Sequence, residues 1–518
     1  MDFLKREVTK KYKISCPSNI ELLRVYQKLL RKKRIKKSER IERLLKTRPI
    51  RSLSGIVNVS VLTKPYLCPG KCLYCPIEKG IPKSYLSGEP AVERAKRLNY
   101  DPYLQVKKRI ETLENEGHPT DKIELRIVGG TWSYYPKKYQ AWFIKRCFQA
   151  CNNKNPSNCK INAMAFVLQE LERAQKLNEK ARHRIVGLSI ETRPDFINEK
   201  EILWLRKLGI TMVELGVQSI YDDVLKLNLR GHGVKETILA TKFLKDAGFK
   251  VLYQIMPNLP GSNVKKDEKM FEELFQNPDF QPDYLKIYPC ALLKEAPLYQ
   301  WWQTGKYKPY SKKTLFKLIK KIKKKIPYYV RIQRIARDIP SQKIIAGGAK
   351  ISNIRQILAK EIKKEKWQCK CIRCREVKEN YDPKERLSFF RLDYEASGGK
   401  EIFLSFENKN RTKLYSLIRL RLPSFVSRET RLLSVLPILK ESAIIREIKT
   451  FGQSVPIGVK KIAPQHQGLG KKLIKEAEKI TKKEFGLKKM VAISSTGARE
   501  YFRKLGYKLK NTYMTKRL

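Results

Sequence analysis

Seven short apolar segments, separated by stretches with helical patterning, constrain the fold of the first two thirds of this chain. They are IVNVSVL (56–62), IELRIVGG (123–130), RIVGLSIE (184–191), TMVELGVQ (211–218), KVLYQIMP (250–257), DYLKIYP (283–289) and VRIQRIA (330–336). Strands that alternate this regularly with helical crossovers predict a parallel β/α sheet or partial barrel. Functional sites of such folds lie at the carboxyl ends of the strands.

The pattern changes after about residue 365. EIFLSFE (401–407) and YSLIRLRL (415–422) predict adjacent antiparallel strands, and SAIIREIKTFG (442–452) and IGVKKIA (457–463) also have strand patterning. A glycine-bearing turn, an amphipathic helix, VAISS, a short helix and YMTKRL complete a second, α+β domain. We therefore expect a basic helical N-terminal segment at 1–50, a partial β/α barrel at 51–365, a cysteine-containing connector at 366–385 and the α+β domain at 386–518.

The charge of the chain points to an anionic partner. Lys and Arg number 111 against 51 Asp and Glu, which gives a formal charge of +60. The usual partner for such a charge is a phosphate backbone, although a lysine-biased proteome is an alternative explanation. The segments 31–46 and 312–325 predict basic helices. No apolar run approaches the length of a membrane span, so we predict a soluble, cytoplasmic protein.

Three cysteines follow the first predicted strand with the spacing C-x3-C-x2-C: Cys68, Cys72 and Cys75. Three thiolates at this spacing hold three irons of a [4Fe–4S] cluster and leave the fourth iron open to S-adenosylmethionine. An electron then cleaves the sulfonium and releases a 5′-deoxyadenosyl radical. A zinc knuckle would need a fourth Cys or His, and none lies within thirty residues downstream. Gly129 and Gly130, after the second strand, are candidates to meet the amino end of the bound methionine.

The remaining cysteines suggest metal binding or packing rather than disulfides in an intracellular chain. Two further groups occur: Cys369, Cys371 and Cys374, and Cys147, Cys151 and Cys159. The first group is either a structural zinc site, which Cys290 could complete from another loop, or a set of free thiols. The second group lies in or after a predicted helix. Its members either pack that helix or form another metal site.

A glycine-rich turn, QHQGLGKKLIKEAEK (465–479), has the pattern Q-x-x-G-x-G and leads into a helix. The glycines let backbone N–H groups and the helix N-terminus point at a pyrophosphate, and the usual ligand is coenzyme A in acetyltransferase-like domains. REYFRKLGYKL (499–509) resembles the closing helix and strand of that fold. An ordinary helix N-terminus is the alternative. None of the four histidines, which include His232 and His466, is predicted to act as a base.

The chain resembles the catalytic subunit of Elongator in its stand-alone archaeal or bacterial form. The resemblance covers nearly everything after residue 50 and includes RSLSGIVNVSVLTKPY, GHPTDKIELRIVGGTW, VELGVQSIYDDVL, RGHG, RDIPSQKIIAGGAKISNIRQ and QHQGLGKKLIKEAE. It implies a radical S-adenosylmethionine (SAM) domain and a GNAT acetyltransferase domain that together modify C5 of the tRNA wobble uridine. The deoxyadenosyl radical would take hydrogen from the methyl group of acetyl-CoA. The carbon radical would add to C5, and hydrolysis would leave a carboxymethyl group.

The resemblance also implies roles for individual residues. The cluster ligands would be Cys68, Cys72 and Cys75. The candidates near SAM are Gly129, Gly130, Glu191 and Gln218. The candidates for the CoA phosphates are Gln465, Gly468, Gly470 and Lys471, with Tyr501 near the thioester. Lys64 and Lys286, beside strand ends, are candidates for contacts with tRNA or a cosubstrate.

The implied partner is tRNA, through its anticodon region, while a homodimer and Elongator-type subunits remain open. Three positions depart from the family pattern. Pro76-Ile77-Glu78 (76–78) replaces a glycine pair, Lys449 replaces a common histidine, and Phe502 replaces the second member of a tyrosine pair. The last two departures concern the acetyl-CoA site.

Three other functions compete with this one. A protein lysine acetyltransferase with a structural iron–sulfur domain would not consume SAM, and the cluster motif with its strand-end partners argues against it. A tRNA methylthiotransferase would carry three further cluster cysteines before the trio, whereas only Cys16 precedes it. A non-enzymatic RNA-binding scaffold would not need intact motifs.

Overall fold

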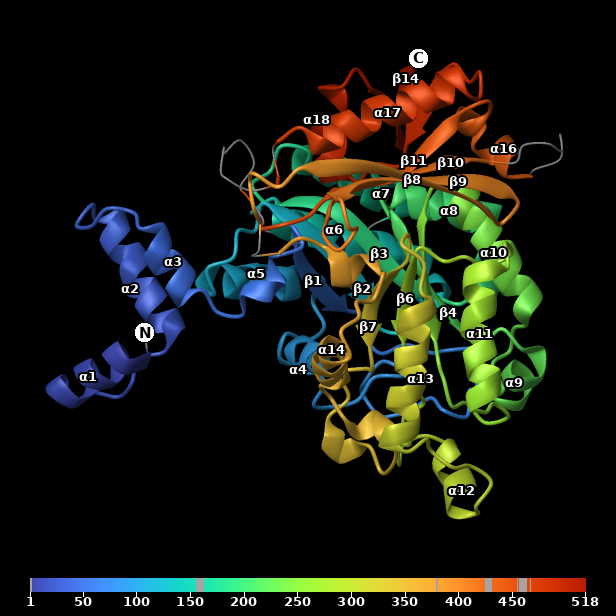
Figure 1. The fold of residues 1–518 in the computed structure, drawn as a ribbon, viewed down its shortest axis with the longest axis horizontal. Coiled ribbons are helices and arrows are strands. Elements are labelled where there is room, and N and C mark those ends of the chain that lie inside the picture. The colour runs from blue at the N-terminus through green and yellow to red at the C-terminus, as the bar shows by residue number, and fades with distance from the viewer. Residues whose placement is uncertain are drawn as a thin grey trace.

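The computed structural model describes residues 2–154, 163–378, 381–423, 431–453, 455, 464–465 and 467–518. These residues form an N-terminal group of helices, a first domain built on a parallel sheet and a second domain built on a mixed sheet (Figure 1). None of the helices in the described part of the chain is long and apolar enough to cross a membrane.

The first sheet contains all seven predicted strands. They are β1 (Val57–Leu62), β2 (Lys122–Val128), β3 (Arg184–Thr192), β4 (Met212–Gln218), β5 (Lys250–Ile255), β6 (Tyr284–Ile287) and β7 (Arg331–Ile335). Each strand pairs in parallel with the next in the chain, and β1 and β7 form the two edges. This curled sheet with an open side confirms the predicted partial barrel.

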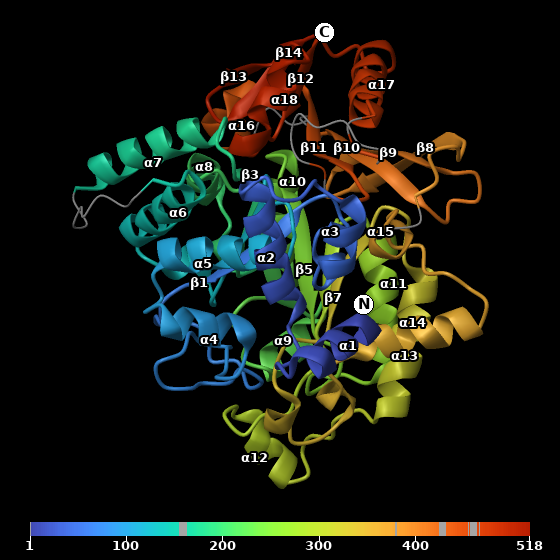
Figure 2. The ribbon, with the colours of Figure 1, turned by 90° about the vertical axis from the view of Figure 1, so that its left-hand side faces the viewer.

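Helices cover the outer face of the half-barrel, as crossover connections require (Figures 1 and 2). They include α5 (Pro102–Asn115), α6 (Lys137–Cys151), α7 (Met164–Asn178), α8 (Glu199–Lys207), α10 (Val234–Asp246), α11 (Val264–Gln276) and α13 (Lys312–Lys325). The basic helix α13 occupies the predicted range 312–325. Cys147 and Cys151 lie buried in the core on α6, as the packing interpretation predicts, whereas Cys159 lies outside the described residues.

Further helices lie in the connections between strands and domains. They are α4 (Pro90–Arg97), α9 (Asp222–Leu227), α12 (Leu298–Gln303), α14 (Ile354–Lys364), α15 (Ile372–Arg375) and α16 (Arg431–Val435). Of these, α9 follows β4 and α15 lies in the cysteine-containing connector.

The second sheet is mixed. Its strands are β8 (Leu387–Ala396), β9 (Gly399–Asn408), β10 (Leu414–Leu422), β11 (Ala443–Thr450), β12 (Lys489–Ala492), β13 (Lys508–Lys510) and β14 (Tyr513–Arg517). Their order is β13-β14-β12-β11-β10-β9-β8, with β11 and β12 parallel and the other pairs antiparallel. Helices α17 (Leu469–Lys483) and α18 (Arg499–Arg503) complete the α+β domain. The predicted strand at 457–463 lies outside the described residues.

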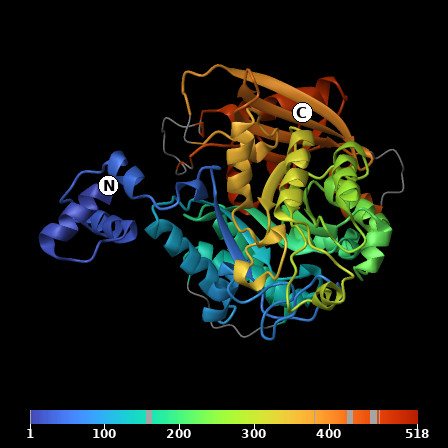
Figure 3. The same cartoon turned by 60° about the horizontal axis from the view of Figure 1, so that its bottom comes forward.

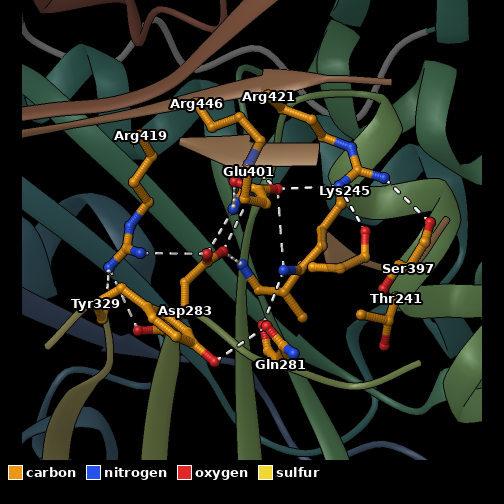
Figure 4. Close-up of polar contacts among 12 residues, drawn as sticks. Thr241, Lys245, Gln281, Asp283, Tyr329, Ser397, Glu401, Arg419, Arg421 and Arg446 are labelled. Carbon is orange, nitrogen blue, oxygen red and sulfur yellow. Dashed lines mark hydrogen bonds and ion pairs between the residues drawn. The ribbon is translucent and has the colours of Figure 1, made fainter. Parts of the chain in front are cut away.

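The second sheet lies across the amino ends of the parallel strands (Figure 1), and a buried ionic network joins the two domains there (Figure 4). Arg446 on β11 donates to Asp283, just before β6, at 2.5 and 2.9 Å, and forms an ion pair of 3.0 Å with Glu401 on β9. Arg421 joins Glu401 to Asp246 at the end of α10. Because buried charges are tolerated only when they are paired, this network fixes how the domains meet.

The N-terminal helices stand beside the two domains rather than within them (Figures 1 and 3). They are α1 (Asp2–Tyr12), α2 (Asn19–Arg31) and α3 (Glu39–Leu45). The prediction of one basic helix over 31–46 is wrong, because α2 ends at Arg31 and α3 starts after Ser38. The Ser38 hydroxyl accepts a hydrogen bond from the Ile41 backbone N–H, so it caps a new helix.

Candidate functional site

The loop that carries Cys68, Cys72 and Cys75 leaves the carboxyl end of β1, as predicted for a site in a parallel β/α fold. A Cβ atom on Gly70 would lie 3.5 Å from the Cys72 Sγ and 3.7 Å from the Cys68 Sγ, so these two thiols gather on one side of the loop. Burial, followed by the neighbouring Cys72, raises the pKa of Cys75 to about 12. Cys75 therefore needs positive charge nearby before its thiol can ionise.

Arg230 supplies positive charge at this loop. Its side chain is buried, and its Nη1 lies 3.6 Å from the Cys72 Sγ, while its other nitrogens donate to the Gly216 carbonyl. Its contacts among the described residues are with this carbonyl and this thiol and include no ion pair. A Cβ on Gly216 would lie 2.7 Å from the guanidinium, so glycine at this position lets Arg230 approach. A buried cation without a carboxylate partner suits an anionic group bound to the three thiolates.

A cavity of about 240 Å³ lies beside Cys75 at the carboxyl ends of the strands. Lys286 on β6 reaches it and contacts Glu191 at 3.0 Å and also Glu214. Burial opposes the charge of Lys286, but Glu214 and Glu191 raise its pKa, so the amine stays protonated. Tyr85 and Gln254 also donate to Glu191, at 3.0 and 3.1 Å. The two carboxylates and the lysine thus form a fixed polar wall.

The other predicted SAM residues differ in their relation to this cavity. Gln218 lines it, has a backbone φ of +71°, and keeps a buried side-chain Oε1 without a hydrogen-bond partner. Strained backbone and an unsatisfied acceptor are typical of ligand sites. Gly129 and Gly130 do not line this cavity, and a Cβ on Gly129 would overlap the Thr63 hydroxyl. Lys64 is exposed, with its amine 5.1 Å from the ring centroid of Tyr139, and does not line the cavity.

The second domain contributes a larger cavity, of about 540 Å³, at the opposite end of the half-barrel. Gly468 has a φ of +78° and stands at the N-terminus of α17, so the turn needs glycine for its backbone conformation. A Cβ on Gly470 would lie 2.7 Å from the Tyr501 hydroxyl, which places these two predicted residues in contact. Lys471 also lines the cavity.

Gln465 has a structural role in addition to lining this cavity. Its amide nitrogen donates to the carbonyls of Gly55 and Thr450, and its Oε1 accepts from Lys122 at 2.7 Å. The side chain therefore ties the glycine-rich turn to both domains. His466 lies outside the described residues.

A third cavity, of about 400 Å³, lies at the open side of the half-barrel between β1 and β7. Glu124 and Lys449 line both this cavity and the one in the second domain. Arg126 and Gln333 line both this cavity and the one beside Cys75. The three cavities therefore lie in series, from the glycine-rich turn to the cysteine loop.

The third cavity, which connects the other two and is called the connecting cavity below, has more cationic than anionic side chains in its lining. Burial lowers the pKa of Lys449 to about 8, and burial together with Arg331 and Arg355 lowers the pKa of Arg373 to about 10. Arg126 and the other cations around it hold the pKa of Glu124 at about 2, although burial opposes this. An excess of positive charge of this kind favours the binding of an anionic ligand.

The connector brings the second predicted cysteine group together. The sulfur atoms of Cys369, Cys371 and Cys374 all lie within 4.8 Å of one another, and they form the one such group of three among the described residues. The prediction that Cys290 completes this group is wrong. Cys290 is buried in a separate apolar cluster with Leu292 and Tyr307, because its loop follows β6 at the other end of the barrel.

Comparisons with known proteins agree with this geometry. Residues 62–274 match the Radical SAM superfamily, and residues 282–364 match the Radical_SAM C-terminal domain. The half-barrel with three cysteines after its first strand therefore defines a radical SAM domain. Membership of this superfamily implies a [4Fe–4S] cluster and SAM. The converging thiols and the buried, carboxylate-free Arg230 fit that cluster.

Full-length relatives narrow the assignment. The chain is 44% identical to a tRNA uridine(34) acetyltransferase of Methanocaldococcus infernus, over 99% of this chain and 94% of that protein. It is 37% identical to Elongator complex protein 3 of Danio rerio, over 92% of this chain and 86% of that protein. The solved archaeal Elp3 of Methanocaldococcus infernus, with an N-terminus deletion, matches 90% of this chain and 100% of its own at 43% identity and a TM-score of 0.75. The chain belongs to the family of tRNA uridine(34) acetyltransferases and Elongator complex protein 3.

Three site residues escaped the sequence analysis as individual candidates. Arg230, Tyr85 and Glu214 all lie within the first domain's site, yet they are distant in sequence from the cysteines. The two glycines that follow Arg230 in RGHG were the available signal. His232 from the same motif lies near the Gly216 and Gly233 carbonyls, and burial lowers its pKa to about 4, so it stays neutral.

Proposed function

We propose that this protein modifies tRNA by installing an acetyl-derived carboxymethyl group at C5 of the wobble uridine. The observation that carries the proposal is the series of cavities between the glycine-rich turn and the cysteine loop. In such a series, an acyl group from one end and a SAM-derived radical from the other can reach the same substrate, and neither has to leave the protein. The names of the relatives, tRNA uridine(34) acetyltransferase, support a uridine substrate.

At the carboxyl end, Cys68, Cys72 and Cys75 would hold the cluster. When bound, the cluster and SAM supply a 5′-deoxyadenosyl radical. Arg230 offsets the negative charge beside Cys72, and the free Oε1 of Gln218 offers an acceptor to a ligand's N–H or O–H group. Glu191 is held by Lys286 and Tyr85, so it presents a fixed, ionised carboxylate to the cavity.

At the amino end, the turn at Gly468 and Gly470 and the N-terminus of α17 would bind the pyrophosphate of acetyl-CoA. Lys471 adds a positive charge there, and Tyr501 lies against Gly470 on the wall of the same cavity. Lys449, at the junction with the connecting cavity, marks where the acyl end would pass toward the barrel.

The connecting cavity would receive the tRNA anticodon. Its cationic side chains are Arg126, Arg331, Arg334, Arg355, Arg373 and Lys449. Because it opens between the edge strands β1 and β7, a base turned out of the anticodon loop enters from the side. The net charge of +60 supports the same partner.

A labelled product tests the proposal. The reconstituted full-length protein is incubated anaerobically with SAM, a reductant, tRNA and acetyl-CoA that carries ¹³C in its methyl group. We expect 5′-deoxyadenosine, together with a wobble uridine whose mass includes the labelled carbon. The lysine acetyltransferase alternative predicts labelled protein, no 5′-deoxyadenosine and no requirement for tRNA.

We also infer that Cys369, Cys371 and Cys374 bind a structural zinc. Thiolates about 2.3 Å from a tetrahedral zinc lie roughly 3.8 Å apart. The three sulfur atoms of this group, all within 4.8 Å of one another, suit three of the four positions on one ion. Lys323 lies 3.4 Å from the Cys374 Sγ, and its ammonium helps to lower the pKa of Cys371, after that thiol's bonds to the other two cysteines. We expect elemental analysis to find one zinc in the wild-type protein and none in Cys371→Ser. The two proteins should contain the same amount of iron.

A further inference from the structure

The loop that carries the cluster cysteines also lines a second, open surface cavity. This cavity shares no lining residue with the cavity beside Lys286. Gly70 forms part of its wall, and a Cβ there would lie 3.5 Å from the Cys72 Sγ and 3.7 Å from the Cys68 Sγ. Gly70 therefore brings the wall of this cavity close to two of the three thiols, and Arg193 and Arg230, which also line the cavity, lie beside the same glycine and Cys72.

One residue that lines this cavity, Leu229, is a leucine at a position where the fold does not require one. Leu229 follows α9 with a backbone φ of +53°, a conformation in which helix ends favour glycine or asparagine. Its N–H and that of Arg230 donate to the Lys226 and Leu225 carbonyls, which is the Schellman pattern. The side chain is 51% exposed. The leucine thus strains the backbone and buries little in return.

The rest of the rim is basic and apolar. Lys71 and Lys226 line the cavity and are exposed, and Leu67, outside the cavity but next to Cys68 in the chain, is 77% exposed. Asp222 also lines the cavity, but its carboxylate accepts the Val234 backbone N–H. Lysines would attract any polyanion, whereas exposed leucines gain nothing from a phosphate backbone. This combination favours an acidic protein over RNA.

We propose that this cavity is the docking surface for a small, acidic one-electron carrier of the ferredoxin or flavodoxin type, an inference that rests on the proposed function. The reduced carrier is oxidised by one electron, and that electron enters the cluster across the Gly70 backbone. Electron-transfer complexes are small and are steered by charge, so two lysines and an exposed leucine suffice as a contact.

Stopped-flow reduction of the reconstituted, full-length protein tests this surface. Reduced flavodoxin and reduced ferredoxin serve as protein donors, and dithionite serves as a donor that needs no docking surface. Leu229→Gly is the key variant, because glycine suits its backbone conformation and folding should be preserved or improved. Lys226→Glu removes a rim charge, and Lys482→Glu, exposed on α17, makes the same charge change in the other domain.

We expect Leu229→Gly and Lys226→Glu to lower the rate constant with at least one protein donor about tenfold, while dithionite reduction stays within twofold of wild type. Unchanged rates with both carriers would overturn the proposal, as would equal slowing with dithionite or a wild-type protein that accepts electrons from dithionite alone. Filter binding of tRNA provides a further check. A larger loss of tRNA affinity in Lys226→Glu than in Lys482→Glu would assign the surface to RNA. Failure of the proposed function itself would instead appear as no SAM cleavage with any donor.

Discussion

Two buried arginines, at opposite ends of the half-barrel, are held in different ways. Arg446, at the amino end, is fully buried and meets the carboxylates of Asp283 and Glu401 (Figure 4). Arg230, at the carboxyl end, is also buried, but its partners are the Gly216 carbonyl and the Cys72 thiol. The charge of Arg446 is therefore compensated by carboxylates of the chain, whereas the charge of Arg230 is available to an anionic ligand.

This difference extends to the surroundings of each arginine. At the amino end, three arginines and four carboxylates form ion pairs with one another, and the same groups join the two domains. At the carboxyl end, Gln218 and Leu229 have positive φ angles, and the Gln218 Oε1 is unsatisfied. Paired charges indicate a structural interface, and strain with unpaired polar groups indicates a binding site.

The largest effect that separates the two ends is expected from a cluster ligand. Cys72→Ala should abolish 5′-deoxyadenosine formation, because one iron loses its thiolate. It should cost only about 1 kcal/mol of folding free energy, since the amino-end network is untouched. Cys147→Ala is the matched control, because Cys147 is a buried thiol of α6 outside the cysteine loop. Its variant should form 5′-deoxyadenosine at the wild-type rate; a comparable loss there would contradict a special role for Cys72.

The converse effect is expected at the amino end. Asp283→Asn leaves Arg446 and Arg419 with one carboxylate fewer in a buried network, and the loss should be about 3–5 kcal/mol of stability. Calorimetry of the metal-free protein measures it. The iron and sulfide content of the folded fraction should equal that of the wild type. Loss of cluster assembly without loss of stability would show that the network serves the site instead.

The pH dependence of stability sharpens the description of the amino end. Lys245 lies in the same network, and burial lowers its pKa to about 8 despite the nearby Glu401. Between the folded value and the usual value near 10.5, the unfolded chain binds a proton that the folded chain does not. The wild type should therefore gain stability relative to Lys245→Met as pH rises from 8 to 10, by up to about 1.4 kcal/mol per pH unit. Urea unfolding at each pH measures the difference, and parallel curves would contradict the depressed pKa.

Local patterns in the sequence predict the parallel sheet, the cysteine loop and the turn before α17, because each depends on residues that are close in the chain. Strand β8 and its hairpin with β9 were not predicted, although Ser397 and Gly398 form a two-residue turn there with φ angles of +50° and +70°. The contact between Arg230 and Cys72 was not readable, because it spans 158 positions and depends on how β4 meets the loop. The predicted pairing of Cys290 with the connector cysteines is wrong for the same reason, because it also depends on a long-range contact.

The smallest expected effect decides between the two interpretations of a buried arginine. Arg230→Met keeps most of the side-chain volume but removes a charge that has no carboxylate partner in the described part of the chain. The metal-free variant should therefore be as stable as the wild type or more stable by about 1 kcal/mol, whereas Arg446→Met should be less stable. In the reconstituted protein, Arg230→Met should be the more damaging of the two substitutions for ligand binding. It should bind iron or SAM about 10–100-fold more weakly than the wild type. Thermal unfolding of the metal-free proteins, with iron and SAM titrations of the reconstituted ones, measures both quantities. If Arg230→Met is destabilised as much as Arg446→Met, Arg230 is structural, and the two ends of the barrel do not differ as argued.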